Sequence, residues 1–186
     1  MERDEAIDLL KKHSTDDKSF NGVLRHSLAV CDVAVGLGQD SLDHGFFVDI
    51  GFIETASILH DIGRFQCPPG TKGSVMHGIR GAAILREENL PEHALVAERH
   101  LGAGITVEDI DNNNLPIPRK EYIPKTAEEK IITYADKIVS DDRIITIDEA
   151  IERFRKEIGE SCASRMIDLH NEIMGFIGRE DRIIKN

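Results

Sequence analysis

Tryptophan is absent from this chain of 186 residues, and its three cysteines are Cys31, Cys67 and Cys162. Cysteines that are odd in number and far apart offer neither a disulfide framework nor a paired CxxC metal motif. We therefore expect ordinary core or loop thiols in a reducing compartment.

Long apolar runs are also lacking. The charged start, residues 1–5, leads to no apolar core of signal-peptide length, and no later segment approaches the ~20 apolar residues that span a bilayer. We therefore expect a cytoplasmic protein without a membrane partner.

Basic side chains are few relative to acidic ones, 23 against 34, which gives a net charge of -11. Such a surface repels a phosphate polymer over long range, so duplex DNA is not an expected partner. A local cluster of Arg and Lys can still hold one nucleotide, and small anionic substrates remain compatible with the sequence.

The remaining composition, 40% apolar and 31% charged, is typical of a helical globular protein of one domain, here residues 1–186. Apolar periodicity predicts helices at 2–13, 20–37, 91–101, 126–139, 147–158 and 161–178. One more helix is predicted to end at 60–61 and another to begin at about 77, and no strand-like alternation is present. The last two are expected to be scaffold or an oligomer surface, compatible with a homodimer.

Three connections separate these predicted helices. Residues 38–45 are polar, and residues 67–74 are rich in Pro and Gly. Residues 102–125 are interpreted as a flap over a site or as an ordinary surface loop. Its candidate ligand-facing side chains are Arg119, Lys120, Tyr122 and Lys125.

Residues 57–64, Ser-Ile-Leu-His-Asp-Ile-Gly-Arg, place two metal-binding side chains at the end of a predicted helix. Neighbouring residues on a helix point about 100° apart, so His60 and Asp61 converge on one ion only where the helix ends. Gly63 is expected to close the helix in the left-handed conformation. Arg64 then emerges beside the pair as a cation for an anionic ligand.

Other candidate ligands lie on further predicted helices. His26 lies on an apolar face, His77 begins a helix and His100 ends one, although a lone inward histidine is more often a core residue than a ligand. Asp136 borders a buried stripe, where an unpaired carboxylate is costly. Two cations follow it as candidate phosphate contacts, Lys137 and Arg143.

The ordered set is His26, His60, Asp61, His77, His100 and Asp136. Four imidazoles and two carboxylates suit Fe, Mn, Co or Zn better than Ca or Mg. Six protein ligands exceed the needs of one catalytic ion. They suit two ions about 3.5–4 Å apart, with Asp61 bridging and a water held between them.

This pattern, with His-Asp-Ile-Gly at 60–63, resembles the HD-domain superfamily of metal-dependent phosphohydrolases over about residues 20–145. The surroundings of His77 and His100 and the segment 128–138 are similar to its six-ligand branch. That branch includes symmetrical diadenosine-tetraphosphate hydrolases and archaeal HDIG proteins of unassigned substrate.

The resemblance implies an all-α helical bundle with the metal site among the central helices, and residues 146–180 outside that core. It implies that the ligands common to the superfamily are His26, His60, Asp61 and Asp136, and that His77 and His100 hold the second ion. Two positions depart from the pattern: Arg64 replaces a usual Lys, and Leu101-Gly102-Ala103-Gly104 replaces the GYP triplet of cyclic di-GMP phosphodiesterases.

The leading hypothesis is hydrolysis of a phosphate ester or anhydride, in a nucleotide or dinucleotide, by a metal-activated water. Asp61 is the predicted catalytic residue, and the predicted substrate-binding residues are Arg64, Lys137 and Arg143. Two alternatives remain open: a di-iron oxygenase of the same fold, and a non-catalytic nucleotide sensor.

Overall fold

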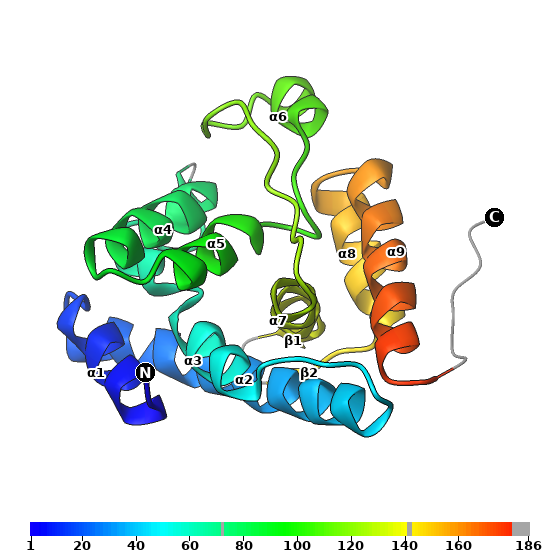
Figure 1. Ribbon diagram of the computed structural model, residues 1–186. Coiled ribbons are helices and arrows are strands. Elements are labelled where there is room, and N and C mark those ends of the chain that lie inside the picture. Colours follow the sequence, from blue (N-terminus) through cyan, green and yellow to red (C-terminus); the bar gives the residue numbers. More distant parts are fainter. Residues whose placement is uncertain (72, 141–142, 180–186) are drawn as a thin grey trace.

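The computed structural model describes residues 1–71, 73–140 and 143–179 (Figure 1). Lys72 and the predicted limits at 180 and 186 lie outside these residues. The all-α prediction is confirmed. The elements are α1 (Arg3–Lys12), α2 (Asp17–Asp43), α3 (Ile50–Leu59), η1 (Ile62–Phe65), η2 (Ser74–Met76), α4 (His77–Glu87), α5 (Pro91–Arg99), α6 (Val107–Asn113), α7 (Ala127–Ile138), β1 (Val139–Ser140), β2 (Arg143–Ile144), α8 (Ile147–Glu157) and α9 (Glu160–Phe176).

Helix α7 occupies the middle of the fold. Figure 1 shows it nearly end-on, with α1, α4 and α5 on one side, α8 and α9 on the other, and α2 running below it. It contacts α2, α3, α5 and α9, and its stripe of Ile131, Ile132 and Ala135 is fully buried. Asp136, which follows Ala135 in the chain, is therefore placed among the helices that pack around α7.

The start of α7 is tied to α5 by one buried carboxylate. Thr126 is the N-cap, because its Oγ1 accepts the Glu129 N–H at 3.2 Å. The Glu129 carboxylate accepts from the Lys125 N–H at 2.6 Å and from Arg99 Nη1 at 2.7 Å. This arrangement fixes the end of α5, after which His100 follows.

The predicted connection at 38–45 is wrong, because α2 continues to Asp43. A Cβ atom on Gly38 would lie 2.8 Å from Ile50 Cδ1, so this glycine permits close packing of α2 on α3. Ser41 Oγ donates to the Leu37 carbonyl at 2.8 Å, which satisfies a polar side chain inside the helix. Residues that resemble a turn in sequence therefore serve a helix contact.

Two short elements were not predicted. Helix α6 lies within 102–125 and begins at a capping box formed by Thr106 and Asp109. Strands β1 and β2 pair antiparallel, Val139 with Ile144 and Ser140 with Arg143. Seven helical residues and two-residue strands are too short to produce a clear periodic pattern.

In the part of the chain that the structure describes, the helices lack the combination of length and apolar character that crossing a bilayer requires.

Candidate metal centre

The fold brings all six predicted ligands together. Their positions in chain order are His26 on α2, His60 and Asp61 directly after α3, His77 at the start of α4, His100 directly after α5, and Asp136 on α7. All but His26 are buried or nearly so, and His26 is half-buried.

A first group of ligand atoms forms around Asp136. His26 Nε2 lies 3.0 Å from Asp136 Oδ1, and His60 Nε2 lies 3.6 Å from the same oxygen. Asp61 Oδ2 lies 4.0 Å from His26 Nε2 and 3.8 Å from His60 Nε2. Two imidazole nitrogens and two carboxylate oxygens thus face one point.

A second group forms around the other oxygen of Asp61. His77 Nε2 lies 3.3 Å and His100 Nε2 lies 3.5 Å from Asp61 Oδ1. The Nε2 atoms of His77 and His100 are 2.9 Å apart. The two oxygens of one carboxylate therefore face different histidine sets, which places Asp61 between the two groups.

Backbone carbonyls orient two of the imidazole rings. His60 Nδ1 lies 2.6 Å from the Ser57 carbonyl, and His77 Nδ1 lies 2.6 Å from the Ser74 carbonyl. Because a carbonyl only accepts, each Nδ1 carries the proton and each Nε2 keeps its lone pair. His60 Nε2 is buried without a hydrogen-bond partner among the described residues, as expected of an atom that fits a metal ion.

The turn after α3 depends on Gly63, but not in the predicted way. Gly63 is not among the glycines with positive φ, and it lies within the 3-10 helix η1. A Cβ at this position would lie 2.0 Å from the His77 carbonyl oxygen and 2.5 Å from the Gly81 nitrogen. The left-handed cap is therefore wrong: Gly63 is required because the backbone of α4 approaches it closely.

The electrostatics keep Asp61 and Asp136 ionised and disfavour the charged forms of His77 and His100. Burial alone would raise the pKa of Asp61, but His60, His77 and Arg64 hold it well below its ordinary value. Burial lowers the pKa of His77 to about 3 and also lowers the pKa of His100. Ionised carboxylates and neutral imidazoles are the forms that ligate a metal.

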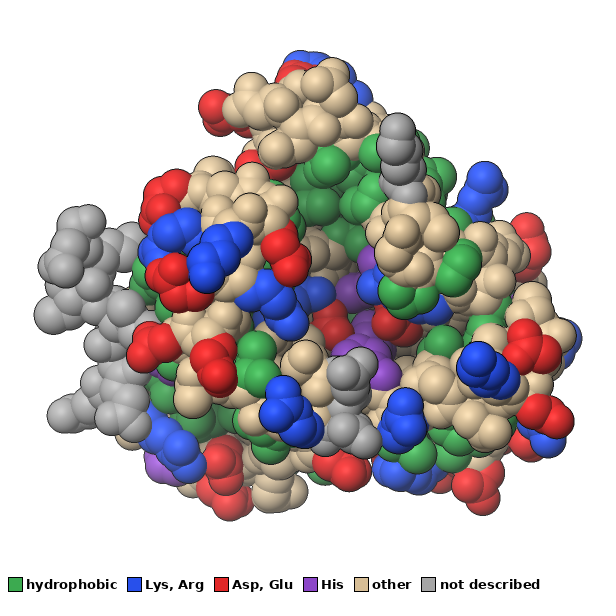
Figure 2. Space-filling model, turned by 180° about the vertical axis from the view of Figure 1, so that it is seen from behind, with side chains coloured by type: hydrophobic (Ala, Val, Ile, Leu, Met, Phe, Trp, Pro, Cys, Tyr) green, Lys and Arg blue, Asp and Glu red, His purple; other side chains and the backbone are tan. Residues whose placement is uncertain are grey.

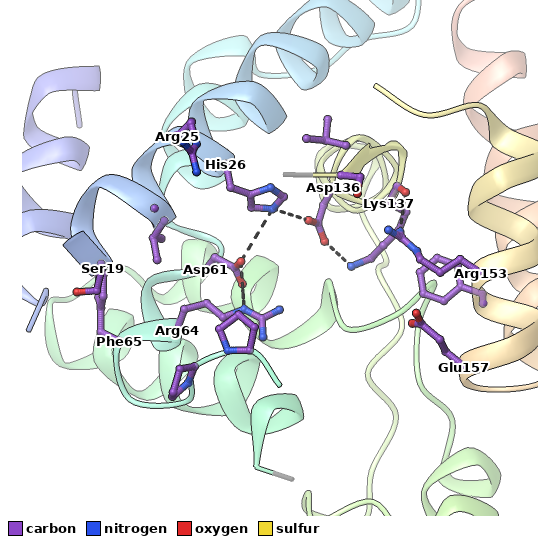
Figure 3. A pocket seen from close by; sticks show the side chains of 17 residues that line it. Ser19, Arg25, His26, Asp61, Arg64, Phe65, Asp136, Lys137, Arg153 and Glu157 are labelled. Carbon is purple, nitrogen blue, oxygen red and sulfur yellow. Dashed lines mark hydrogen bonds and ion pairs between the residues drawn. The ribbon is translucent and has the colours of Figure 1, made fainter. Parts of the chain in front are cut away.

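A cavity of about 660 Å³ opens over the first group. Figure 2 shows the hollow, in which histidine, acidic and basic side chains gather, and Figure 3 shows the walls around His26, Asp61 and Asp136. Arg64 Nε contacts both oxygens of Asp61, at 3.1 and 3.2 Å, and Lys137 Nζ contacts Asp136. Two predicted substrate-binding cations therefore lie at the cavity floor.

Helix α8, which was predicted to be scaffold or an oligomer surface, supplies one wall of the cavity. Arg153, Phe154 and Glu157 line it, and Arg153 Nη2 donates to the Lys137 carbonyl at 2.9 Å. Arg25 of α2 lines it as well. The sequence carries no local signal for these residues, because only the docking of α8 beside the end of α7 brings them to the site.

Other predicted ligand-facing residues lie elsewhere. Arg143 is exposed on β2 and is not among the residues lining the cavity. No residue of 102–125, a range described in full, lines it either. The flap cations pair locally instead, Arg119 with Asp111 and Lys120 with Glu98.

Comparison with known sequences identifies the family. The HD domain model matches residues 23–141. An uncharacterized protein of Methanocaldococcus jannaschii is 39% identical over 180 residues, 95% of this chain and 99% of the relative. A tRNA (cytidine(56)-2'-O)-methyltransferase of Picrophilus torridus is 33% identical, over 100% of this chain and 50% of that protein. The chain thus spans about half the length of this methyltransferase.

Solved structures show the same fold. Two crystal structures of the L. monocytogenes phosphodiesterase PgpH HD domain, one in complex with cyclic-di-AMP, each superpose with a TM-score of 0.52 at 17% identity. They cover 93% and 98% of this chain, and 95% and 100% of their own. HD domains bind divalent metals, and the grouped His and Asp side chains fit that requirement. The family match and the nearly full-length relative show that the chain belongs to the HD domain family.

Proposed function

We propose that this protein is a metal-dependent phosphohydrolase that cleaves a phosphate ester or anhydride of a nucleotide or dinucleotide. One observation carries the proposal: His26, Asp61 and Asp136 line a cavity that also holds cations, and the buried His60, His77 and His100 approach the same two carboxylates. Ligands for a metal and charges for a phosphate thus meet at one place.

Two divalent transition metal ions, of Fe, Mn, Co or Zn, suit the two groups of ligand atoms. The first is assigned to His26, His60 and Asp136, the second to His77 and His100, and Asp61 contributes one oxygen to each. Such ions supply a water of lowered pKa and neutralise phosphoryl oxygens. Mixed nitrogen and oxygen ligands favour these metals over Ca or Mg.

The chain's own residues position the reactants. Asp61, whose two oxygens would hold the ions, is assigned to orient the attacking water. Arg64 offers a planar fork of donors to the phosphate, while Lys137 offers a point charge from the opposite side of the site. Arg64 also contacts Asp61, so a bound phosphate competes with that carboxylate for its donors.

The relatives support a nucleotide-type substrate. The PgpH HD domain has been crystallised with cyclic-di-AMP, and two relatives are named as enzymes that act on tRNA. We therefore place cyclic dinucleotides, diadenosine polyphosphates, nucleoside phosphates and RNA end phosphates on one substrate panel. The cavity of about 660 Å³ is comparable to sites for single small molecules, and the chain's net charge opposes a long polymer.

The test combines metal analysis with activity. We expect about two ions per chain after anaerobic purification, and hydrolysis of at least one panel member with Mn, Fe, Co or Zn. Asp61→Asn keeps the side-chain volume and removes the charge, so it should lower both metal content and kcat/KM, the latter roughly 100-fold or more.

The matched control is Asp109→Asn, because Asp109 is also buried and paired, here with Arg165. This variant should keep metal content and turnover, since it removes a buried carboxylate outside the site. A parent protein that binds no metal, or an Asp61→Asn variant equal to the parent, would contradict the proposal. Metal binding without turnover on the panel would favour a sensor, and oxygen consumption would favour an oxygenase.

A further inference from the structure

The cavity has two unlike ends. Figure 3 shows Ser19 and Phe65 together at one end and Arg153 and Glu157 at the other, with His26, Asp61 and Asp136 between them. Arg153 and Glu157 bring charge to their end, where Phe154 also lines the cavity. The two ends therefore suit different parts of one ligand.

The end near Phe65 is mostly apolar. Besides Phe65, its residues are Pro68 and Pro69, which follow Phe65 in the chain, and Ser19, Gly22 and Val23 of α2; the set is here named the apolar slot. None of these side chains carries a charge, and among them the Ser19 hydroxyl alone can donate a hydrogen bond. Gly22 lies four residues before His26 on α2, about one helical turn away. A group in the slot therefore lies next to the ligands.

Gly22 leaves open space on the cavity wall. A Cβ built there meets no atom within 4 Å, so no packing contact accounts for a glycine in this helix. Glycine costs about 1 kcal/mol relative to alanine at such a position. Gly36 on α2 is equally open, but it is not among the residues lining the cavity. Two matched glycines thus differ in whether they face the cavity.

Resting on the proposed function, we propose that the apolar slot binds the base of a nucleoside phosphate, with its phosphate at the ligands and cations. A base is flat with apolar faces, so it can stack on Phe65 and the two proline rings while its phosphate reaches Arg64. Inorganic polyphosphate and simple sugar phosphates leave the slot filled with water. The substrate class is therefore a nucleotide, held by its base.

The experiment measures binding to the Mn²⁺-loaded full chain by calorimetry. The probes are the four 5′-nucleoside monophosphates and inorganic phosphate. At least one monophosphate should bind the parent roughly tenfold or more tighter than inorganic phosphate, since a stacked base contributes ~1–3 kcal/mol. Gly22→Leu fills the slot and should abolish this preference, with the affinity for inorganic phosphate changed less than about twofold.

Gly36→Leu is the matched control, because it places the same side chain in open space on the same helix. It should keep the preference of the parent. The proposal is contradicted if the parent binds every monophosphate no tighter than inorganic phosphate. It is also contradicted if Gly22→Leu keeps the preference, or weakens the binding of the monophosphate and of inorganic phosphate equally. Failure of the proposed function is distinguishable, because the parent then neither binds inorganic phosphate nor hydrolyses any substrate.

Discussion

At the scale of single residues, Asp61 connects the parts of the site. One carboxylate oxygen faces His26 and His60, the other faces His77 and His100, and the Arg64 guanidinium contacts both. Removing this carboxylate therefore affects both groups at once. The turn after Asp61 depends on Gly63, which has no side chain.

Gly63→Ala tests that turn. The added Cβ meets the His77 carbonyl oxygen at 2.0 Å, a backbone atom that moves only if α4 moves. We expect a loss of about 1–3 kcal/mol in the free energy of unfolding, typical of overpacking, and a lower metal content because His77 shifts with α4. Chemical denaturation and metal analysis measure the two effects.

Gly36→Ala serves as its control, since this Cβ meets nothing within 4 Å. The control should equal or exceed the parent in stability, because alanine favours a helix. A Gly63→Ala variant as stable and as metal-rich as the parent would show that α4 is not held by this contact.

The residue types at the site were accessible from sequence, but their surroundings were not. Four histidines and two aspartates at helix ends or on apolar faces indicated a metal site, and the structure brings these side chains together. Gly63 was misread because local sequence suggests a helix cap, whereas the contact with His77 and Gly81 arises between helices. Arg153 was missed for the same reason.

His93 makes stability depend on pH away from the metal site. Burial lowers its pKa to about 4, with a contribution from the N-terminal amino group, and its Nε2 lies 3.0 Å from Thr55 Oγ1. Unfolded histidine titrates near 6.5. The unfolded chain therefore binds more protons between pH 6.5 and 4, so acidification through this window destabilises the fold, by up to roughly 3 kcal/mol from this group.

His93→Gln removes the titrating group and keeps a polar side chain beside Thr55. We expect the free energy of unfolding to fall less between pH 7 and 4 in this variant than in the parent. Urea denaturation at several pH values gives the difference between the two slopes. Parallel pH profiles would contradict a neutral buried imidazole at this position.

At the scale of elements, α8 is part of the site as well as a packing helix. Its inner face buries Ala150, Ile151 and Phe154, while Arg153 lines the cavity and bonds to the carbonyl of Lys137 on α7. The next arginine, Arg155, pairs with Glu152 and Glu160 on the surface. Arg155 is therefore a surface control for Arg153 on the same helix.

Arg153→Gln is expected to weaken substrate binding. The change removes a cation from the cavity wall, so KM should rise roughly tenfold while metal content stays near that of the parent. Arg155→Gln, on the same helix, should leave KM unchanged because this side chain lies outside the cavity. Equal KM values for both variants would contradict a role of Arg153 in substrate binding and leave α8 as scaffold.

The order of the main helices followed from the sequence, because their buried stripes repeat at helical spacing. The short elements did not. Gly38 and Ser41 look like turn residues, yet close packing on α3 and a bond to the Leu37 carbonyl keep them helical. Helix α6 depends on its capping box at Thr106, a signal too short to outweigh the surrounding Asn and Pro residues.

At the scale of the whole molecule, charge is distributed unevenly. The chain carries a net charge of -11, yet the cavity brings Arg25, Arg64, Lys137 and Arg153 together. Repulsion at long range opposes polynucleotides, while the local cations favour a small anion that can enter the cavity. The ligands also come from helices far apart in the sequence.

Because α2, α3, α4, α5 and α7 all contribute ligands, metal binding should stabilise the entire fold. An ion that binds only the folded chain adds about 2.7 kcal/mol at a free concentration of 100 Kd. For a chain of this size, 1 kcal/mol corresponds to about 2–4 °C, so Mn²⁺ should raise Tm by roughly 5–10 °C, and EDTA should reverse the rise. Thermal unfolding monitored by circular dichroism measures both.

The Asp61→Asn variant separates this linkage from nonspecific binding to an acidic protein. Its surface carboxylates are those of the parent, so nonspecific Mn²⁺ binding would raise both Tm values equally. Binding between the helices requires Asp61 in both ligand groups, so the variant should show a much smaller rise. A large rise of Tm in the parent but not in the variant would show that Mn²⁺ stabilises the fold by binding at Asp61, where the helices meet.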